Sequence, residues 1–312
     1  MIYNSNRIMD LRQLRYFVAV AEERHFGRAA QRLHMSQPPL SMQIKALERE
    51  LGIRLLERTS RRVALTHAGR AFLKQAKKIL DAVEEAKEEA RGAEEGMRGV
   101  LEVGFISSAT LSLLPPSIRL FRERFGGVEL ELKELTSSQQ VDALYGGEIK
   151  VGLVRLPMRA PGIQFEPVLE ERLVVALPSG HALERLDRVS LEAIADLPLI
   201  FFTRQLIPGF HAQIVELFQR VGAFPKVAQH AVHLQTIVGL VASGVGIAIL
   251  PASAERASRE GVVYRALDVP DATSWMGLAW IEGDESKLVK NFIATVREAA
   301  GGKVPDLPNP NP

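Results

Sequence analysis

The sequence of 312 residues contains no cysteine. Disulfide bonds, thiolate–zinc sites and cysteine nucleophiles are therefore excluded. No run of about eighteen apolar residues is present to span a bilayer, and the first residues, MIYNSNRIMDLRQ, lack the apolar segment of a signal peptide. These absences predict a cytoplasmic protein that does not have a membrane as a partner.

Motifs for metal binding, phosphate binding and catalysis are also missing. The seven histidines show no metal-ligand spacing, since His230 and His233 stand three residues apart without a third ligand. There is no glycine-rich phosphate loop, and no Ser, His and Asp follow a catalytic order beyond chance. We therefore predict no metal site, no cofactor and no catalytic residue.

The length and the charge distribution indicate several domains. A chain this long exceeds the usual size of one domain, so two or three are expected. The net charge is only +2, but residues 1–66 contain twelve Lys and Arg against six Asp and Glu, which leaves 27 against 31 in the remainder. A basic N-terminal module favours nucleic acid as a partner, although a charged face is often merely solvated.

The segment from Phe26 to Gly52, FGRAAQRLHMSQPPLSMQIKALERELG, has the pattern of two short helices joined by a tight turn. Ser36 can cap the second helix, whose first turn holds two prolines. One side of that helix carries an apolar stripe of Leu40, Ile44, Leu47 and Leu51. Its other side has small and polar residues that suit a DNA major groove, although the pattern alone equally fits an ordinary helical hairpin.

The flanking segments favour the DNA-binding alternative. Leu11 to Glu23 has the apolar spacing of a third helix, which is enough to close a small three-helix core. Leu55 to Thr66, LLERTSRRVALT, has the pattern of two short strands around a basic turn, which is a wing. We therefore predict a winged helix-turn-helix domain over residues 1–66.

A long helix is predicted over residues 67–92, with Thr66 as its N-cap. Its apolar stripe consists of Ala68, Phe72, Ala76, Ile79, Val83, Ala86 and Ala90. A small wing domain cannot bury so long a stripe, so we expect a partner helix to contact Phe72, Ala76, Ile79 and Val83. The alternative is a solvated spacer held by ion pairs between successive turns. Three glycines, at 92, 96 and 99, predict a hinge over residues 93–99.

Strand and helix patterns alternate between residues 100 and 300. This rhythm predicts two α/β halves with a largely parallel sheet, in which the last strand and helix return to the first half. The Pro-rich tail, residues 301–312, is predicted to be disordered.

Residues 11–70 resemble the winged helix-turn-helix domain of LysR-type transcriptional regulators, through LRQLRYFVAVAEE, FGRAAQRLHMSQPPLSMQIKALERELG, LLERT and LTHAGRAFL in that order. The segments ELTSSQQVDAL, GLVRLP and GLVASGVGIAILP resemble, more diffusely, the effector domain of the same regulators. Met42 departs from the pattern, because many relatives carry arginine or another polar residue there. GLVRLP and LRQLRYFVAVAEE are similar to regulators of aromatic-compound catabolism that sense muconate-like dicarboxylates.

The resemblance implies the fold class and the function. The fold is an α-helical winged helix-turn-helix domain, a long linker helix and a periplasmic-binding-protein-like α/β effector domain with two Rossmann-like halves. The function is a ligand-responsive, DNA-binding transcriptional regulator. The implied partners are double-stranded promoter DNA, a small organic anion as effector, RNA polymerase, and the protein itself as a dimer and a homotetramer.

For DNA contact we assign the polar side of the second helix to the groove and the arginines of the wing to the DNA backbone. The residues are Gln37, Pro38, Pro39, Ser41 and Lys45 in the groove, and Arg58, Arg61 and Arg62 in the wing. Gln37 can both donate to and accept from adenine, whereas arginines in a wing position the protein rather than specify a base. The two prolines can contact a thymine methyl or simply start the helix.

For the effector, a cleft between two α/β halves gathers strand ends and helix N-termini, which favour an anion. The candidates are Ser107, Ser108, Thr136, Ser137, Arg155, Phe202 and Thr203. The alternatives are that the hydroxyls only cap helices and that Arg155 meets a protein carboxylate instead of a ligand.

Two other classes of protein use the same α/β scaffold. A solute-binding protein would need a signal sequence and no DNA-binding module. An enzyme would need an acid–base pair in the cleft, and none is identified. Both are kept only as alternatives to the regulator.

Overall fold

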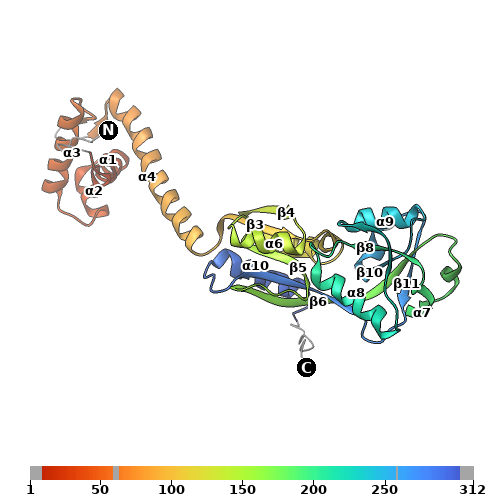
Figure 1. The fold of residues 1–312 in the computed structure, drawn as a ribbon. Helices are drawn as coiled ribbons and strands as arrows, with labels where there is room; N and C mark the ends of the chain where they lie inside the picture. Colours follow the sequence, from red (N-terminus) through yellow and green to blue (C-terminus); the bar gives the residue numbers. More distant parts are fainter. Residues whose placement is uncertain (1–8, 59–62, 258, 303–312) are drawn as a thin grey trace. The chain divides into compact units, whose positions relative to one another are not determined.

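The computed structural model describes residues 9–58, 63–257 and 259–302 (Figure 1). It divides into two compact units, Met1–Arg91 and Gly92–Pro312, each of which is described by itself. The first unit contains α1 (Leu11–Glu23), α2 (Phe26–Arg32), α3 (Gln37–Leu51), the two-stranded sheet of β1 (Leu56–Arg58) and β2 (Val63–Leu65), and most of α4 (His67–Glu94). The predicted winged helix-turn-helix is therefore confirmed.

Local signals explain where these helices begin and end. Asp10 forms a capping box with Gln13 at the start of α1, and α3 ends at Gly52, whose φ of 68° favours glycine. The apolar faces of the helices meet in one core around the fully buried Phe17, Leu40, Ile44 and Leu47. Three helices thus bury a common face, and the N-terminal half of α3 keeps its other side at the surface.

The long helix α4 begins as predicted, because the Thr66 hydroxyl accepts the Gly69 N–H at 2.9 Å. Its first turns complete the core of the domain. Phe72 packs edge-on against Phe17 at 5.1 Å between ring centroids, and Ala76 is fully buried. The prediction that Ala76 contacts a partner helix is therefore wrong. The partly buried Phe72 packs against the core of its own domain.

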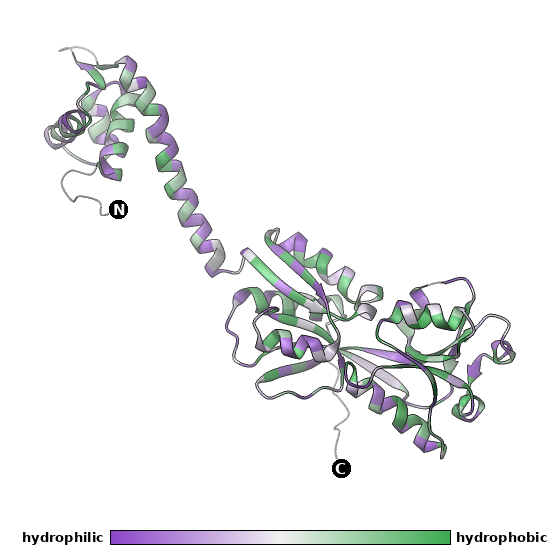
Figure 2. Cartoon of the chain, turned by 45° about the horizontal axis from the view of Figure 1, so that its top comes forward, coloured by the Kyte–Doolittle hydropathy of each residue, from purple (hydrophilic) through white to green (hydrophobic). Residues whose placement is uncertain are grey.

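Further along α4 the apolar side chains are more exposed: Ile79 is 40% exposed and Val83 is half-buried. Hydrophilic residues dominate the helix, with apolar ones recurring along it (Figure 2). The helix continues to Glu94, two residues beyond the prediction, and the next strand begins at Arg98. The turn between them occupies residues 95–97.

Glycine is required at position 96 for two reasons. Its φ is +66°, and an added Cβ would lie 2.9 Å from the backbone of Lys287 and Leu288. The start of the second unit is therefore packed closely against the beginning of its last helix.

The second unit is built on an eight-stranded sheet with the order β4-β3-β5-β12-β6-β11-β7, in which β10 also pairs with β6. A separate two-stranded sheet is formed by β8 and β9. The strands are β3 (Arg98–Phe105), β4 (Gly127–Glu134), β5 (Val151–Leu156), β6 (Ile163–Pro178), β7 (Arg188–Val189), β8 (Pro198–Phe202), β9 (Lys226–Ala231), β10 (Ala248–Pro251), β11 (Val262–Leu267) and β12 (Thr273–Ile281).

The sheet is mixed, so the prediction of a largely parallel sheet is wrong. Strands β3, β4 and β5 are parallel, but β12 is antiparallel to both β5 and β6, and β10 and β11 are antiparallel to β6. The reason is that β6 carries the chain from the first half into the second, and β12 brings it back. Two neighbouring crossings in opposite directions must pair antiparallel.

Helices cover both halves. They are α5 (Leu114–Arg124), α6 (Ser137–Tyr145), α7 (Leu191–Ile194), α8 (Pro208–Arg220), α9 (Leu234–Ala242) and α10 (Lys287–Ala299), with short 3-10 turns η1 (Ser107–Leu111), η2 (Ala182–Arg185) and η3 (Ala252–Arg256). In the first half, α5 and α10 pack together through Phe121 and Phe292, whose ring centroids are 5.4 Å apart. The return of the last strand and helix to the first half is confirmed. No helix among the described residues is long and apolar enough to cross a membrane.

Candidate DNA-binding face and effector cleft

The start of α3 is set by a serine and two prolines. Ser36 occupies the N-cap position as predicted, with extended backbone, but its hydroxyl makes no capping hydrogen bond. An N-cap side chain normally accepts the N–H of the second or third helical residue, and here both are prolines, Pro38 and Pro39, which have none. The proline pair thus starts the helix by fixing φ, and it leaves this end without a polar cap.

The predicted groove residues lie on the accessible side of α3. Gln37, Pro38 and Lys45 are exposed, whereas Pro39 and Ser41 are half-buried. By the helical period, Pro38 and Lys45 project away from the buried stripe of the helix, whereas Gln37, Pro39 and Ser41 flank that stripe. This arrangement is what a helix needs in order to enter a major groove.

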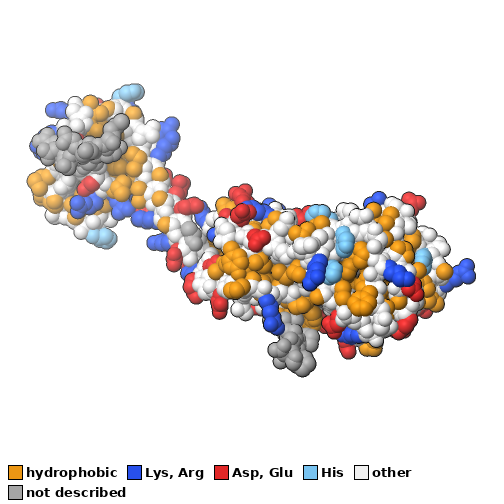
Figure 3. Space-filling view, viewed as in Figure 1, with side chains coloured by type: hydrophobic (Ala, Val, Ile, Leu, Met, Phe, Trp, Pro, Cys, Tyr) orange, Lys and Arg blue, Asp and Glu red, His pale blue; other side chains and the backbone are white. Residues whose placement is uncertain are grey.

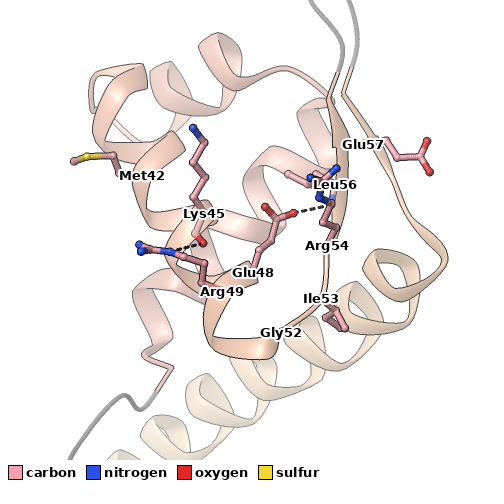
Figure 4. Close-up of a pocket in the computed structure, with 9 residues that line it drawn as sticks. All are labelled: Met42, Lys45, Glu48, Arg49, Gly52, Ile53, Arg54, Leu56 and Glu57. Atoms are coloured by element: carbon pink, nitrogen blue, oxygen red, sulfur yellow. Dashed lines mark hydrogen bonds between the residues drawn. The ribbon is translucent and has the colours of Figure 1, made fainter.

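The wing is anchored to α3 by one carboxylate. Glu48 accepts the backbone N–H of Leu55 at 2.9 Å and of Leu56 at 3.0 Å, at the point where the first wing strand begins (Figure 4). Arg58 is the last residue of β1 and pairs with Val63 of β2. The other two wing arginines of the prediction, Arg61 and Arg62, lie outside the described residues.

Ion pairs occupy other basic residues of the domain. Arg28 contacts Glu23 at 3.4 Å, and Arg32 contacts Glu22 at 2.8 Å. Lys77 also contacts Glu22, and its hydrogen bond, with that of Arg32, lowers the pKa of the Glu22 carboxyl. These arginines therefore brace α2 against α1, whereas the basic side chains beside the accessible face of α3 are Lys45, Arg49 and Arg54.

A small cavity lies between the two halves of the second unit. It encloses about 30 Å³ and receives side chains from both halves. Its lining consists of Ile106, Ser107, Ser108, Arg155, Phe202, Ile207, Phe210, Leu234 and Pro251. Four of these were predicted from the sequence: Ser107, Ser108, Arg155 and Phe202.

Arg155 has a protein carboxylate as its partner. Its Nη1 lies 2.7 Å from the Glu171 carboxylate, and both side chains are more than nine-tenths buried. Its Nη2 donates to the Ser108 hydroxyl at 2.7 Å. The second Glu171 oxygen accepts the Ser253 N–H at 3.2 Å. In this structure Arg155 therefore pairs with a protein carboxylate, which was the alternative to a contact with a ligand.

The strand register brings this pair together. On β12, Met276 is opposite Arg155 of β5, and Ser274, two residues away on the same face, is opposite Glu171 of β6. Arg155 and Glu171 thus lie diagonally on one face of three neighbouring strands. Arg155 Nη1 is also 3.5 Å from the Ser274 hydroxyl.

The hydroxyls at the start of α6 serve the fold. Thr136 is the N-cap and forms a capping box with Gln139, and the Ser137 hydroxyl accepts the backbone N–H of Arg155 at 3.0 Å. Neither residue lines the cavity. Thr203, which follows β8, donates its N–H to the Ala231 carbonyl and also lies outside the lining.

Hydrogen bonds cross directly between the two halves. The Ser107 hydroxyl accepts the Leu234 N–H, the first of α9, at 3.5 Å. Ser138 donates its hydroxyl to the Gln205 carbonyl at 3.0 Å and its N–H to the Leu206 carbonyl at 3.3 Å. The halves are therefore held close together around the cavity.

His211 of α8 is not among the residues that line the cavity. His211 stacks on Phe201 at 4.3 Å between ring centroids. Burial lowers the pKa of this histidine, and the nearby Arg204 and His230 lower it further. His211 is therefore neutral at physiological pH. Space filling shows histidines beside basic and hydrophobic side chains on one face of this unit (Figure 3).

The sequence did not reveal the carboxylate partner or most of the apolar wall. Glu171 is buried between the exposed Glu170 and Arg172, so strand alternation was the available signal. Ile207, Phe210 and Leu234 come from the starts of α8 and α9, where no local pattern indicates a cavity.

Comparisons with known proteins agree with both units. Residues 11–70 match the family model "Bacterial regulatory helix-turn-helix protein, lysR family", and residues 94–301 match "LysR substrate binding domain". The "HTH-type transcriptional regulator AlsR" of Bacillus subtilis is 37% identical over 285 residues, which cover 91% of this chain and 94% of the relative.

Solved structures similar to this chain belong to the same family of regulators. The LysR family transcriptional regulator CbnR has 30% sequence identity and a TM-score of 0.83, covering 93% of this chain and 100% of CbnR. Full-length CbnR complexed with its target DNA has 29% identity and a TM-score of 0.82, covering 94% and 100%. With its winged helix-turn-helix, its two-half α/β unit and these relatives, the chain belongs to the LysR family of DNA-binding transcriptional regulators.

Proposed function

We propose that the protein binds promoter DNA as an oligomer and changes transcription by RNA polymerase when a small organic carboxylate enters the cleft of the second unit. The observation that carries the proposal is the cavity lined from both α/β halves, in a chain whose first unit presents an accessible recognition helix. A ligand between two halves can couple its binding to their relative movement.

The size of the cavity supports this coupling. A volume of about 30 Å³ holds no more than two or three waters, whereas ligand pockets usually span about 300–1,000 Å³. An effector must therefore separate the halves and break bonds such as Ser107–Leu234 and Ser138–Leu206. A ligand with higher affinity for the more open form then shifts the population toward it.

The polar groups of the lining favour a carboxylate. The hydroxyls of Ser107 and Ser108 can turn to donate, and the Leu234 N–H becomes available when the halves separate. Arg155 adds positive charge beside Ser108, although Glu171 balances most of it. The surrounding wall of Phe202, Phe210 and other apolar side chains suits a ligand with an apolar body.

Effector binding is testable by thermal stability of the full-length protein. Benzoate, cis,cis-muconate or a related acid is expected to raise the melting temperature, because a ligand that binds only the folded state stabilises it. Ser107→Ala should reduce that shift by at least half, since it removes a hydroxyl from the cavity. Differential scanning fluorimetry measures both.

A matched control is Ser243→Ala, which removes an exposed serine hydroxyl from the far end of α9. This variant should respond to ligand like the wild type. If aromatic acids, muconates and amino acids all leave the melting temperature unchanged, none of these carboxylates is an effector of the protein. If Ser107→Ala responds like the wild type, the ligand binds elsewhere.

DNA reading by α3 is testable with Gln37→Ala. This change should weaken binding to a specific operator by about 1–3 kcal/mol and leave binding to random DNA nearly unchanged, because a base contact carries sequence information. Gln43→Ala, an exposed glutamine on another side of α3, is the control and should change neither affinity. Equal losses on operator and random DNA would show that Gln37 contacts the DNA backbone. Fluorescence anisotropy measures both affinities.

A further inference from the structure

Met42 is an exposed apolar side chain on the recognition helix. It is 65% exposed, and among the large hydrophobic residues that the structure describes as exposed only Phe224, at 69%, exceeds it. Single exposed apolar residues are common on protein surfaces. The position of Met42 within α3 places it where DNA would be contacted.

The helical period places Met42 opposite the core. Met42 is two residues from both Leu40 and Ile44, which is about 200° around a helix with 3.6 residues per turn. The side chains of Leu40 and Ile44 are both fully buried. Met42 therefore stands near the middle of the outward face, with Pro38 one turn before it and Lys45 one turn after it.

The surroundings of Met42 are basic on one side and apolar on the other. Lys45 and Arg49 follow it on successive turns, and together the three side chains line the same side of an open groove beside the wing (Figure 4). Pro38 adds an exposed apolar ring one turn earlier. The outward face thus has an apolar centre that is bordered by two cations.

This arrangement complements a DNA major groove. Lys45 and Arg49 can neutralise phosphates at the edge of the groove, where cations supply affinity without sequence information. The apolar feature that the major groove offers beside that edge is the C5-methyl group of thymine. A methionine side chain is long, unbranched and flexible enough to pack against such a group.

We propose that Met42 reads a thymine of the operator by packing its side chain against the C5-methyl group, and that it is a specificity-determining residue of this protein. The inference rests on DNA binding through α3 and adds a base preference to it. It needs no hydrogen bond from position 42, where an arginine or another polar residue would read a different base.

The test removes the methyl group from the DNA instead of changing the protein. Operator sequences are first selected from a random-sequence library with the full-length protein. Each thymine of the selected site is then replaced in turn by deoxyuridine, which lacks only the C5-methyl group. At one thymine per half-site we expect wild-type affinity to fall about fourfold, the value for burying one group of that size.

Met42→Ala should lose affinity for the unmodified site and become insensitive to deoxyuridine at that same thymine. Gln43→Ala should keep the wild-type sensitivity, because Gln43 lies on another side of α3. If no deoxyuridine substitution weakens the wild type, or if Met42→Ala remains equally sensitive at every thymine, Met42 does not read the methyl group. If Met42→Ala folds poorly, Met42→Gln takes its place as the variant, and a wild-type series without any sensitive thymine overturns the proposal without a variant.

Discussion

Replacing Glu171 by alanine should lower the free energy of unfolding of the second unit by about 3–5 kcal/mol. The change leaves the Arg155 guanidinium buried without its carboxylate, and both side chains are more than nine-tenths buried. The Ser253 N–H also loses its acceptor. A buried, uncompensated charge costs far more than the loss of a surface pair. Urea unfolding followed by circular dichroism measures the effect.

The control is the double variant Arg155→Met with Glu171→Met, which replaces the pair by apolar side chains. It should recover most of the lost stability, because a buried ion pair is often no more stabilising than apolar residues of similar volume. Arg155→Met alone should also destabilise, because it leaves the Glu171 carboxylate buried. A Glu171→Ala variant as stable as the wild type would mean that water reaches Arg155.

The sequence predicted the parts of the fold that depend on local periodicity. The stripe of Leu40, Ile44 and Leu47 defined α3, and the strong turn signals at Ser36 and Gly52 defined its ends within one residue. The Ser36 hydroxyl nevertheless failed as a cap, because the two prolines that mark the helix start also remove the N–H groups that it would bind.

What the sequence did not predict depends on pairing between distant segments. Arg155 and Glu171 are 16 residues apart, and Ser274 is 119 residues from Arg155, yet strand register places all three on one face. Local patterns suggested a parallel sheet because they do not show which strands cross between the halves. For the same reason, Ser137 could not be distinguished in advance as a backbone acceptor instead of a ligand contact.

The apolar stripe of α4 shows the same limit. The helix forms as predicted, but the spacing of the stripe cannot say which domain buries which part of it. Ala76 is fully buried within its own winged domain, whereas Ile79 is 40% exposed only three residues later. The part of the stripe that we propose for pairing with a partner helix therefore begins at Ile79 and continues with the half-buried Val83.

Replacing Ile79 by lysine is expected to separate the proposed oligomer and to weaken operator binding by a factor of about 100 or more. A lysine in an apolar helix–helix interface must be desolvated without a partner, which opposes pairing. Two linked DNA-binding domains bind with an effective concentration that a separated monomer lacks. The added positive charge can only strengthen attraction to phosphate, so a loss of affinity would come from the loss of pairing.

Asp81→Lys is the matched control, because it places a lysine on the exposed, opposite side of the same helix. That variant should remain oligomeric and bind the operator at least as tightly as the wild type. Sedimentation velocity measures the oligomeric state, and fluorescence anisotropy at fixed salt measures the affinity. If Ile79→Lys sediments like the wild type, α4 does not pair through this part of its stripe. If it dissociates but binds the operator with unchanged affinity, then the protein recognises its operator without needing a second DNA-binding domain.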